Sequence, residues 1–430
     1  METKKSSFGK PYLLKRFVVI AIALCSVLLV ALPAIAAEDD FVLGIYGNAN
    51  EDDTIDMRDL TYVKLIFFGE KPETELADAK YDGEINPLDF VQIKLVIVGK
   101  EKELTLLQYL GKSPDITEKP VTINTPINKT VILSSYAAKT LWAFGEQDGI
   151  VGVDDSTKKK AEFESFVAEI PSVGRYSKWD TEAIMELNPD IVLLYSFRTW
   201  PDFVEKLNAA GIPVVQMDFY RPEKYSREIR NCGWMLGKQE KAEELINFEQ
   251  QYLGLIEERV EDLKEDQKPR VYYETHGGDY TTYGTGGVGH NTIVFCGGTN
   301  IFEEIDYYAE VDPEAIIVRN PQVILREMSV NMLPCGYGVT DTGPMDELRN
   351  SIMGHPGWDH IDAVKNGGVY LISLDSKTVH PSIFHSYVAK WIHPELFEDL
   401  DPVAIHEEWF QRFLDMEFNG VYAYPTYPVS

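Results

Sequence analysis

The chain has 430 residues, of which 44% are hydrophobic and 12% aromatic. It is too long for a single core and has enough apolar side chains to build two or three domains. Its formal net charge of −29 at pH 7 argues against nucleic acid as a partner and suits solubility or a salty or calcium-rich exterior.

The first 37 residues have the layout of an export signal. Five basic side chains precede Phe17, the run from Phe17 to Leu32 is almost wholly apolar, and small residues before Ala37 are typical of a cleavage site. The apolar run is about long enough to span a bilayer, so residues 1–37 are either a cleaved signal peptide or an uncleaved N-terminal anchor. We therefore expect an exported protein, at the outer face of the cytoplasmic membrane, in the cell envelope or outside the cell.

Three cysteines follow this segment: Cys232, Cys296 and Cys335. Their odd number and the lack of a C-x-x-C motif argue against a disulfide framework and against a thiolate metal site. A bridge from Cys296 to Cys335 is compatible with export, but nothing in the sequence requires it.

Residues 40–104 contain two similar acidic loops, each followed by an apolar helix. Oxygen-bearing side chains recur through a twelve-residue frame, which suits calcium because a hard cation takes about six to eight oxygen ligands. The predicted ligands are Asn48, Asn50, Asp52, Asp56 and Asp59 in the first loop and Asp78, Asp82, Asn86 and Asp89 in the second. Two loops in register with matched helices favour a metal site over ordinary turns.

This pair of loops resembles the type I dockerin module, with which it shares a final Asp in each loop. The resemblance implies a small all-α, EF-hand-like domain that Ca2+ holds folded and that docks onto a cohesin-like partner. Asp53 stands where the first loop should have glycine, and Lys80 replaces a ligand and should weaken the second site by placing a cation beside the metal. Residues 105–120 are expected to be a linker, because Pro114 and Pro120 interrupt any regular pattern.

Strand and helix signals alternate from Val121 onward. Short β-branched runs predict strands and amphipathic stretches predict helices. The predicted strands are 130–133, 149–153, 190–195 and 214–217, and the predicted helices are 136–144, 180–187 and 200–210. This alternation is typical of a parallel α/β layer, so we expect a first lobe over residues 121–224.

Residues 225–265 have helical periodicity without proline and predict one long backbone helix. A second α/β set follows it. The predicted strands are 270–274, 322–325 and 368–372, and the predicted helices are 291–295, 312–318 and 380–396. We expect a C-terminal lobe with a closing helix over residues 266–418 and a tail over 419–430. The predicted fold class is α/β, with two Rossmann-like lobes joined by a long rigid α-helix and preceded by the small all-α module.

The two lobes share one sequence motif. The segment from Asp180 to Leu194 recurs from Asp312 to Arg326, with an Asn-Pro pair at the same place in each copy. Each copy predicts a short helix, a stop and a buried strand, because proline disfavours the α region at the preceding residue and a β-branched run suits a covered parallel strand. The duplication indicates two similar lobes, each with an acidic residue at the same position.

The order of lobe, helix and lobe resembles the helical-backbone class of solute-binding proteins of ABC importers. The motifs resemble the iron-siderophore and vitamin B12 branch of that class, among them Gly-Gly-Thr-Asn at 297–300 and Ala-Val-Lys-Asn-Gly at 363–367. Further similar stretches are 131–145, 150–154, 173–174, 182–190, 211–215, 358–362 and 389–397. The resemblance implies a protein without catalytic residues that captures a metal chelate, either an iron-siderophore or a cobalamin-like compound, and delivers it to an ABC permease and its ATPase.

The resemblance also implies that Glu182 and Glu314 dock onto basic pockets of two permease subunits. Two exposed carboxylates at matching positions suit a two-fold partner, where charge fixes orientation more than affinity. The alternative is that both are ordinary carboxylates beside a helix N-terminus, after the capping residues Asp180 and Asp312, and docking is the favoured interpretation.

The loops after the strands are where α/β lobes bind ligands. Arginine beside aromatic rings in these loops suits a bulky anionic chelate or a macrocycle, although a structural role is an equal alternative for each residue. The predicted ligand-binding residues are Tyr136, Arg175, Arg198, Trp200, Tyr220, Tyr283 and Arg326.

All eight histidines follow residue 275. A site for bare zinc or manganese would take imidazoles from both lobes, so the distribution favours a chelated metal. His385 and His393 are expected to cap or pack the terminal helix. The G-x-G-x-x-G match at 284–289 is a weak dinucleotide signal, and we predict no redox cofactor and a glycine-shaped, ligand-facing loop instead.

Two other classes of protein stay open. A secreted hydrolase with a docking module is one, although the chain has no G-x-S-x-G or H-E-x-x-H motif. A cohesin-bound scaffold component is the other, and it leaves the two lobes unexplained.

Overall fold

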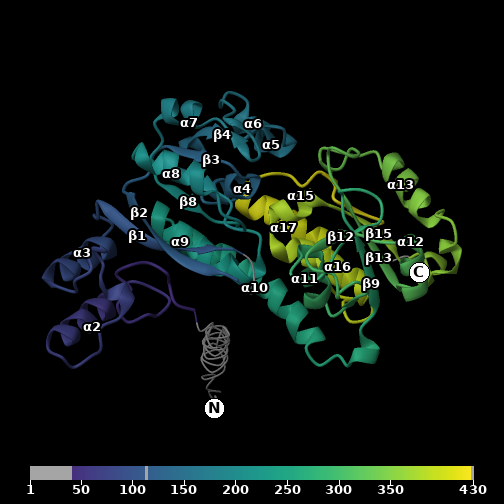
Figure 1. The fold of residues 1–430 in the computed structure, drawn as a ribbon, viewed down its shortest axis with the longest axis horizontal. Helices are drawn as coiled ribbons and strands as arrows, with labels where there is room; N and C mark the ends of the chain where they lie inside the picture. Colours follow the sequence, from purple (N-terminus) through teal and green to yellow (C-terminus); the bar gives the residue numbers. More distant parts are fainter. Residues whose placement is uncertain (1–40, 112–114, 428–430) are drawn as a thin grey trace, which may run out of the picture. The chain divides into compact units, whose positions relative to one another are not determined.

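The computed structural model describes residues 41–111 and 115–427, and the predicted export signal lies outside them. Within these described residues, no helix combines the length and the apolar character needed to cross a bilayer. Elements are labelled as in Figure 1.

Two loop–helix units begin the described chain. α2 (Met57–Phe67) and α3 (Pro87–Ile97) both start with a capping box built on the ninth and twelfth residues of the preceding loop. Glu51 and Tyr81, at matching places in the two loops, are both left-handed, with φ of 56° and 52°. A 3-10 turn, η1 (Glu75–Ala77), lies between the units. The predicted internal repeat is therefore present in the structure.

The prediction of a linker at residues 105–120 is wrong. β1 (Glu103–Leu110) pairs along its length with the antiparallel β2 (Thr117–Asn124). Pro120 belongs to an edge strand, where a missing N–H costs no ladder bond. β1 also bonds to the chain before α2, since the Leu107 N–H donates to the Gly44 carbonyl, and the described residues from Val42 onward form one compact unit.

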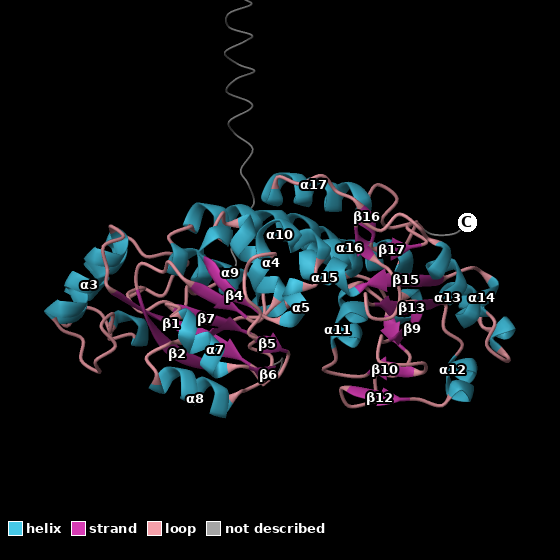
Figure 2. Ribbon diagram, turned by 90° about the horizontal axis from the view of Figure 1, so that it is seen from above, coloured by secondary structure: helices cyan, strands magenta, loops and turns pink. Residues whose placement is uncertain are grey.

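The first lobe is built on a four-stranded parallel sheet with the order β4-β3-β7-β8. Its strands are β3 (Thr130–Ile132), β4 (Ile150–Val153), β7 (Ile191–Leu194) and β8 (Val214–Gln216), which confirms the four predicted strands. The predicted helices are confirmed as α4 (Ser135–Ala143), α7 (Thr181–Leu187) and α8 (Pro201–Ala209). Shorter elements are η2 (Gln147–Gly149), α5 (Asp155–Lys158), η3 (Ala161–Phe163), α6 (Glu164–Val167), β5 (Gly174–Arg175) and β6 (Lys178–Trp179). Figure 2 shows α7 and α8 on one face of this sheet and α4 on the other.

The predicted single backbone helix is wrong, because the segment forms α9 (Pro222–Leu236) and α10 (Gln239–Val260). Gly237 ends α9 in the left-handed region, with φ of 66°, and its N–H bonds to the carbonyls of the last turn. The two helices pack closely, since a Cβ on Gly233 would approach the Ala242 Cβ to 2.5 Å. The chain therefore bends at Gly237.

The second lobe is built on a mixed sheet with the order β12-β10-β9-β13-β15-β17, and β11 also pairs with β9. Its strands are β9 (Arg270–Glu274), β10 (Thr281–Tyr283), β11 (Thr299–Asn300), β12 (Tyr308–Glu310), β13 (Val323–Met328), β15 (Val369–Ser373) and β17 (Ala423–Tyr424). Its helices are η4 (Glu265–Gln267), α11 (Val288–Phe295), α12 (Pro313–Arg319), α13 (Gly343–Met353), η5 (Trp358–His360), α14 (Asp362–Lys365), α15 (Leu374–Val379), α16 (Pro381–Ile392) and α17 (Pro402–Leu414). β9, β13 and β15 are parallel, as predicted for strands that alternate with helices. Figure 2 shows α13 and α14 on one face of this sheet and α11 on the other.

The end of the chain departs from the prediction in two ways. The closing helix α16 ends at Ile392 rather than at residue 396, because Pro394 disfavours a helical residue before it, and α17 follows as an unpredicted helix. Residues 419–430 were expected to be a tail, but β16 (Gly420–Val421) pairs with β14 (Gly336–Tyr337), and β17 joins the sheet of the second lobe.

The predicted duplication is confirmed at the level of backbone. α7 and α12 both follow an aspartate cap, Asp180 and Asp312, and both end at a left-handed asparagine. Asn188 has φ of 47° and Asn320 has φ of 44°, and β7 and β13 then follow. The same sequence signal therefore gives the same helix, stop and strand in both lobes.

Candidate ligand site between two aromatic surfaces

The carboxyl ends of the two sheets lie on the sides where the lobes meet. α4 begins directly after β3, α15 begins directly after β15, and these two helices contact each other. Lys160 of the first lobe and Asp375 of the second form a largely buried ion pair at the same junction. The loops that carry the predicted ligand residues are therefore on the facing sides of the lobes.

Five rings of the first lobe form a continuous series of contacts, here called the aromatic row. Its members are Trp200, Tyr176, Tyr195, Tyr136 and Tyr220, with successive centroid distances of 5.6, 6.0, 6.3 and 4.4 Å. Tyr136 and Tyr220 are stacked, and the other pairs meet edge to face. The row brings together segments that follow three strands of the sheet and the turn between β5 and β6.

Arginines lie at both ends of the aromatic row. The Arg198 guanidinium is 4.5 Å from the centroid of Trp200 and the residue is exposed, whereas Arg221 is 5.3 Å from the centroid of Tyr220 and is buried. Stacked guanidinium and aromatic groups attract each other, so each cation is held beside a ring face. The row thus offers flat apolar faces with positive charge at its exposed end.

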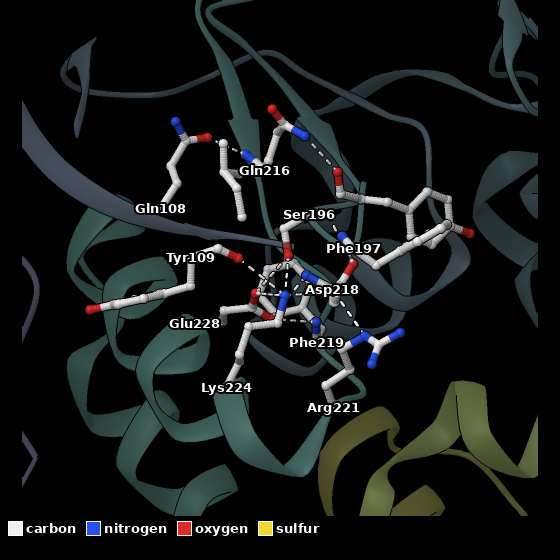
Figure 3. Close-up of polar contacts among 12 residues, drawn as sticks. Gln108, Tyr109, Ser196, Phe197, Gln216, Asp218, Phe219, Arg221, Lys224 and Glu228 are labelled. Carbon is white, nitrogen blue, oxygen red and sulfur yellow. Dashed lines mark hydrogen bonds and ion pairs between the residues drawn. The ribbon is translucent and has the colours of Figure 1, made fainter. Parts of the chain in front are cut away.

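A buried ion cluster joins the loops after β7 and β8 to α9 (Figure 3). The Lys224 ammonium is 2.7 Å from the Asp218 carboxylate and 3.5 Å from that of Glu228, and it donates to the Ser196 hydroxyl and the Tyr109 carbonyl. Lys224, Asp218 and Glu228 are each at most 1% exposed. Arg221 is a second cation of the cluster, with its guanidinium 3.3 Å from Asp218. Burial raises the pKa of Glu228, and the neighbouring Lys224 ammonium opposes that rise.

The two carboxylates fix the loops that carry the row. Asp218 accepts the backbone N–H groups of Ser196 and Phe197 at 2.9 and 3.1 Å. Glu228 accepts those of Asp218 and Phe219 at 2.9 and 2.7 Å, and Phe219 is left-handed with φ of 60°. The ion cluster therefore holds the loops after β7 and β8 in one geometry.

The second lobe presents its own rings and a buried carboxylate. Tyr283 lies 5.8 Å from Tyr273 and 5.9 Å from Tyr308 between ring centroids. The Tyr273 hydroxyl donates to Glu327 at 2.9 Å, and Nδ1 of His276 lies 2.8 Å from the same carboxylate. Glu327 is fully buried.

The two aromatic surfaces approach each other. The pKa of Tyr136 is raised well above its usual value by burial, by the neighbouring tyrosines of the row and by the charge of Glu327 across the junction. The pKa of Tyr283 is raised by burial, by Glu327 and by several tyrosines that include Tyr220. The charge of Glu327 in the second lobe therefore acts on Tyr136 in the first lobe.

The structure sorts the predicted ligand residues. Tyr136 and Tyr220 are stacked on each other at one end of the aromatic row, Arg198 and Trp200 lie at the other end, and Tyr283 belongs to the ring group of the second lobe. Arg175 is exposed in β5, outside the row.

Arg326 belongs to the protein interior. It is 2% exposed, and its guanidinium donates to the carbonyls of Thr275 and Gly278 and lies 3.4 Å from Glu274. These contacts stabilise the turn between β9 and β10, so carbonyl groups of the chain already bind Nη1, one of the donors that the prediction assigned to a ligand.

Sequence reasoning missed Tyr195, Tyr273, His276, Tyr308 and Glu327. Tyr195 and His276 come directly after strands, where the rule that selected Tyr136 applies equally. Tyr273 and Glu327 lie inside strands, and only the three-dimensional pairing shows that they belong to the junction.

The glycine-rich segment before α11 serves packing. A Cβ on Gly284 would lie 1.9 Å from the Ile305 carbonyl oxygen, and one on Gly289 would lie 2.5 Å from the Tyr283 ring. These glycines allow close approach of two chain segments and of Tyr283, which accounts for the motif without a nucleotide.

Other predicted residues have structural roles. His385 is hydrogen-bonded to the Pro381 carbonyl and His393 to that of Gly297, and both histidines are buried, which confirms that they pack the closing helix. Cys232, Cys296 and Cys335 are buried free thiols.

The first acidic loop surrounds a buried carboxylate. Asp59 is fully buried, accepts the backbone N–H groups of Asn50 and Asp56 at 3.1 and 2.7 Å, and burial raises its pKa to about 6. The Arg58 guanidinium lies 3.0 Å from the Asp52 carboxylate, so a positively charged side chain of the protein contacts this loop. A buried carboxylate among oxygen donors fits a hard cation, although in the described part of the chain no three His, Cys, Asp or Glu side chains converge into a cage.

The second acidic loop repeats this geometry. Asp89 accepts the N–H groups of Lys80 and Asn86 at 2.9 and 2.7 Å. The Lys80 ammonium lies 3.6 Å from Glu103 at the start of β1, so it does not stand beside the loop oxygens as predicted. The second loop therefore lacks an oxygen ligand at position 80, and the Lys80 ammonium is paired with Glu103 instead.

Glu182 and Glu314 occupy equivalent, exposed positions at the starts of α7 and α12. The capping bonds to the helix ends come from Asp180 and Asp312, at 3.0 and 2.9 Å from the N–H groups of the two glutamates. Both glutamate carboxylates are therefore open to solvent on the two lobes.

Comparison with known proteins supports the same architecture. The chain is 26% identical over 247 residues to a cobalamin-binding protein of Halobacterium salinarum, covering 55% of this chain and 64% of that protein. It is 24% identical over 268 residues to an uncharacterized ABC transporter substrate-binding lipoprotein of Bacillus subtilis, covering 61% of this chain and 78% of that protein. A TroA-like periplasmic binding protein, FepB of Veillonella parvula, has the same fold with a TM-score of 0.62 and 22% identity, over 74% of this chain and 99% of that chain.

Residues 131–375 match the periplasmic binding protein family, and they include the parallel strands of both lobes and the residues of the aromatic row. This match covers more than half of the chain. The chain therefore belongs to the periplasmic binding protein family.

Proposed function

We propose that this chain is an extracytoplasmic substrate-binding protein of an ABC importer. It captures a metal chelate, either a cobalamin-like corrinoid or an iron-siderophore, and delivers it to the permease and its ATPase. The observation that carries the proposal is the aromatic row, which follows the carboxyl ends of the strands of the first lobe, on the side where α4 contacts α15 of the second lobe.

The chemistry of the junction suits a large, flat and partly anionic ligand. Ring faces stack on macrocycles and catecholates, and Arg198 supplies a cation at the exposed end of the row. The relative from Halobacterium salinarum is named for cobalamin binding, which supports a corrinoid as the first ligand to test.

The proposal is tested by tryptophan fluorescence with cyanocobalamin, a ferric hydroxamate, a ferric catecholate and haemin. We expect one class to quench Trp200 on binding, and removal of the stacked pair by Tyr136→Ala with Tyr220→Ala to weaken that binding at least tenfold, since each aromatic contact contributes about 0.5–1.5 kcal/mol beyond its area. Tyr62→Ala on α2 is the matched control outside the row. Absence of binding by all four compounds, or binding that the double variant leaves unchanged, overturns the proposal.

Recovery of the ligand separates binding from catalysis. A binding protein returns the chelate unchanged after denaturation, whereas a secreted hydrolase returns products. Analysis of the released compound by mass spectrometry therefore distinguishes the two classes.

We also propose that residues 40–104 are a dockerin-like module that binds Ca2+ and a cohesin-like partner. Each loop would hold one Ca2+ ion with its own oxygens, and the two ions would neutralise the buried Asp59 and Asp89 carboxylates. The apolar surface that α2 and α3 expose supports a protein partner: Met57 is 65% exposed, Phe68 76% and Leu88 58%.

Calcium titration of the full chain tests the module. We expect heat of binding and a rise in melting temperature, because a ligand that binds the native state stabilises it. Asp59→Ala should remove the first site. Equal melting temperatures with Ca2+ and with a chelator would contradict the proposal.

A further inference from the structure

His276 is held by a buried carboxylate at the edge of the second aromatic surface. It follows β9 by two residues, and Glu327 in β13 accepts both its backbone N–H at 3.3 Å and its Nδ1–H at 2.8 Å. The other oxygen of Glu327 accepts the Tyr273 hydroxyl at 2.9 Å. The Glu327 side chain is fully buried, whereas that of His276 is 44% exposed.

This arrangement fixes which ring nitrogen is free. When Glu327 is ionised it only accepts hydrogen bonds, which places the proton of a neutral His276 ring on Nδ1 and leaves the lone pair on Nε2. Among the described residues, the only hydrogen-bond partner of the His276 ring is Glu327. Histidines that coordinate metal ions use the same arrangement, in which a carboxylate orients the ring through its other nitrogen.

The carboxylate belongs to the junction between the lobes. Glu327 raises the pKa of Tyr136 in the first lobe, after burial and the neighbouring tyrosines, so its charge reaches across the junction. The next residue, Gly277, packs against the ring cluster, since a Cβ there would lie 2.4 Å from the Tyr308 hydroxyl. His276 is therefore in direct contact with Glu327, the carboxylate whose charge acts on Tyr136 of the aromatic row.

We infer that His276, oriented by Glu327, is a protein ligand to the metal ion of the bound chelate. This inference rests on the proposed function. A chelate with one weakly held water on its metal exchanges that water for Nε2: the metal–oxygen bond breaks, the metal–nitrogen bond forms and the water leaves, with no change of oxidation state. The chelator supplies the remaining ligands, so one imidazole is sufficient.

The inference separates two classes of chelate. A complex with an exchangeable axial position gains a coordinate bond in addition to stacking on the aromatic row. A complex whose coordination sphere is closed gains stacking alone. The residue pair His276 and Glu327 is therefore a specificity determinant for the coordination state of the cargo.

The test uses the full chain and three probes with coordinated water: aquocobalamin, haemin and a ferric chelate that retains water. We expect binding of one probe to shift its visible absorption bands toward those of its imidazole adduct. His276→Ala should abolish that shift and weaken binding at least tenfold, and free imidazole should restore the shift. Glu327→Gln should reduce the shift, and His360→Ala, which alters an exposed histidine elsewhere in the lobe, should leave it intact.

Each outcome decides one claim. If no probe binds, and closed-sphere chelates such as cyanocobalamin also fail, the proposed function is overturned. If a probe binds to the native chain and to His276→Ala with the same spectrum and affinity, or if only closed-sphere chelates bind, the inference is overturned while the proposed function stands.

Discussion

Glu249 of α10 accepts two hydrogen bonds from Ser382 at the start of α16, from its N–H at 2.7 Å and from its hydroxyl at 2.9 Å. The bonds join the helix between the lobes to the closing helix of the second lobe. His380 lies 3.3 Å from Glu249, and burial raises the pKa of Glu249 to about 8 and lowers that of His380 well below its usual value. Both groups are therefore uncharged near pH 7.

The first prediction concerns the pH dependence of stability. The native state binds the Glu249 proton more tightly than the unfolded chain, so this stabilisation is complete below pH about 4.5 and is lost as the pH rises through about 8. The free energy of unfolding should fall by up to about 1.4 kcal/mol per pH unit across this window. Glu249→Gln should remove this slope in urea titrations from pH 5 to 8.5, a range of about three and a half units. Glu258→Gln on the same helix is the control, and an unchanged slope in Glu249→Gln would contradict the assignment.

The second prediction concerns the buried ion cluster of Lys224, Asp218 and Glu228. Lys224→Met leaves the Glu228 carboxylate buried without a cation and leaves Asp218 with Arg221 alone, at 3.3 Å, so it should lower the free energy of unfolding by about 3–5 kcal/mol. Adding Glu228→Gln to this variant should recover part of the loss. Lys241→Met removes an exposed ion pair and should cost less than about 1 kcal/mol. Equal losses for Lys224→Met and Lys241→Met in urea titrations would refute the role of the cluster.

The third prediction concerns delivery to the permease. Charge reversal by Glu182→Lys with Glu314→Lys should abolish uptake in cells or proteoliposomes and leave chelate affinity unchanged, because both carboxylates are exposed and outside the aromatic row. Glu186→Lys with Glu347→Lys makes the same change in net charge at other exposed sites. Normal uptake by the first pair, or equal loss in both pairs, would argue against specific docking.

The fourth prediction concerns the second calcium loop. Lys80→Asp restores an oxygen at the vacant ligand position and should raise the calcium affinity of that loop roughly tenfold, or about 1.4 kcal/mol. Lys100→Asp makes the same change in charge outside both loops. Isothermal titration calorimetry measures both variants, and an equal gain in the two would show a general charge effect only.

The sequence predicted those parts of the fold that depend on local signals. The β-branched run at Ile191–Leu194 and the Asn-Pro stop before it gave both the strand and its boundary, and the same signal in the second lobe was equally reliable. Helical periodicity failed at Gly237, because a single left-handed residue leaves the pattern on either side intact while it changes the direction of the chain.

The candidate site was predictable only where a residue follows a strand. Tyr136 and Tyr220 were found in this way, whereas the direction of a charged side chain inside a strand depends on its tertiary partners. Arg326 was therefore assigned to the ligand although it contacts Glu274, and Glu327 beside it was overlooked although it reaches the junction. His276 and Glu327 are far apart in the sequence, so nothing local announces their contact.

The hairpin of β1 and β2 has a mechanical consequence. It shares backbone hydrogen bonds with the chain before α2, and Asn231 of α9 donates to the Leu107 carbonyl. The front module is therefore packed against the first lobe and is not joined to it by a flexible tether. A partner that binds the front module therefore fixes the orientation of the first lobe, because in the described residues the paired strands β1 and β2 join the two and no random-coil spacer separates them. The range of orientations open to the first lobe then depends on how rigidly that partner is itself held.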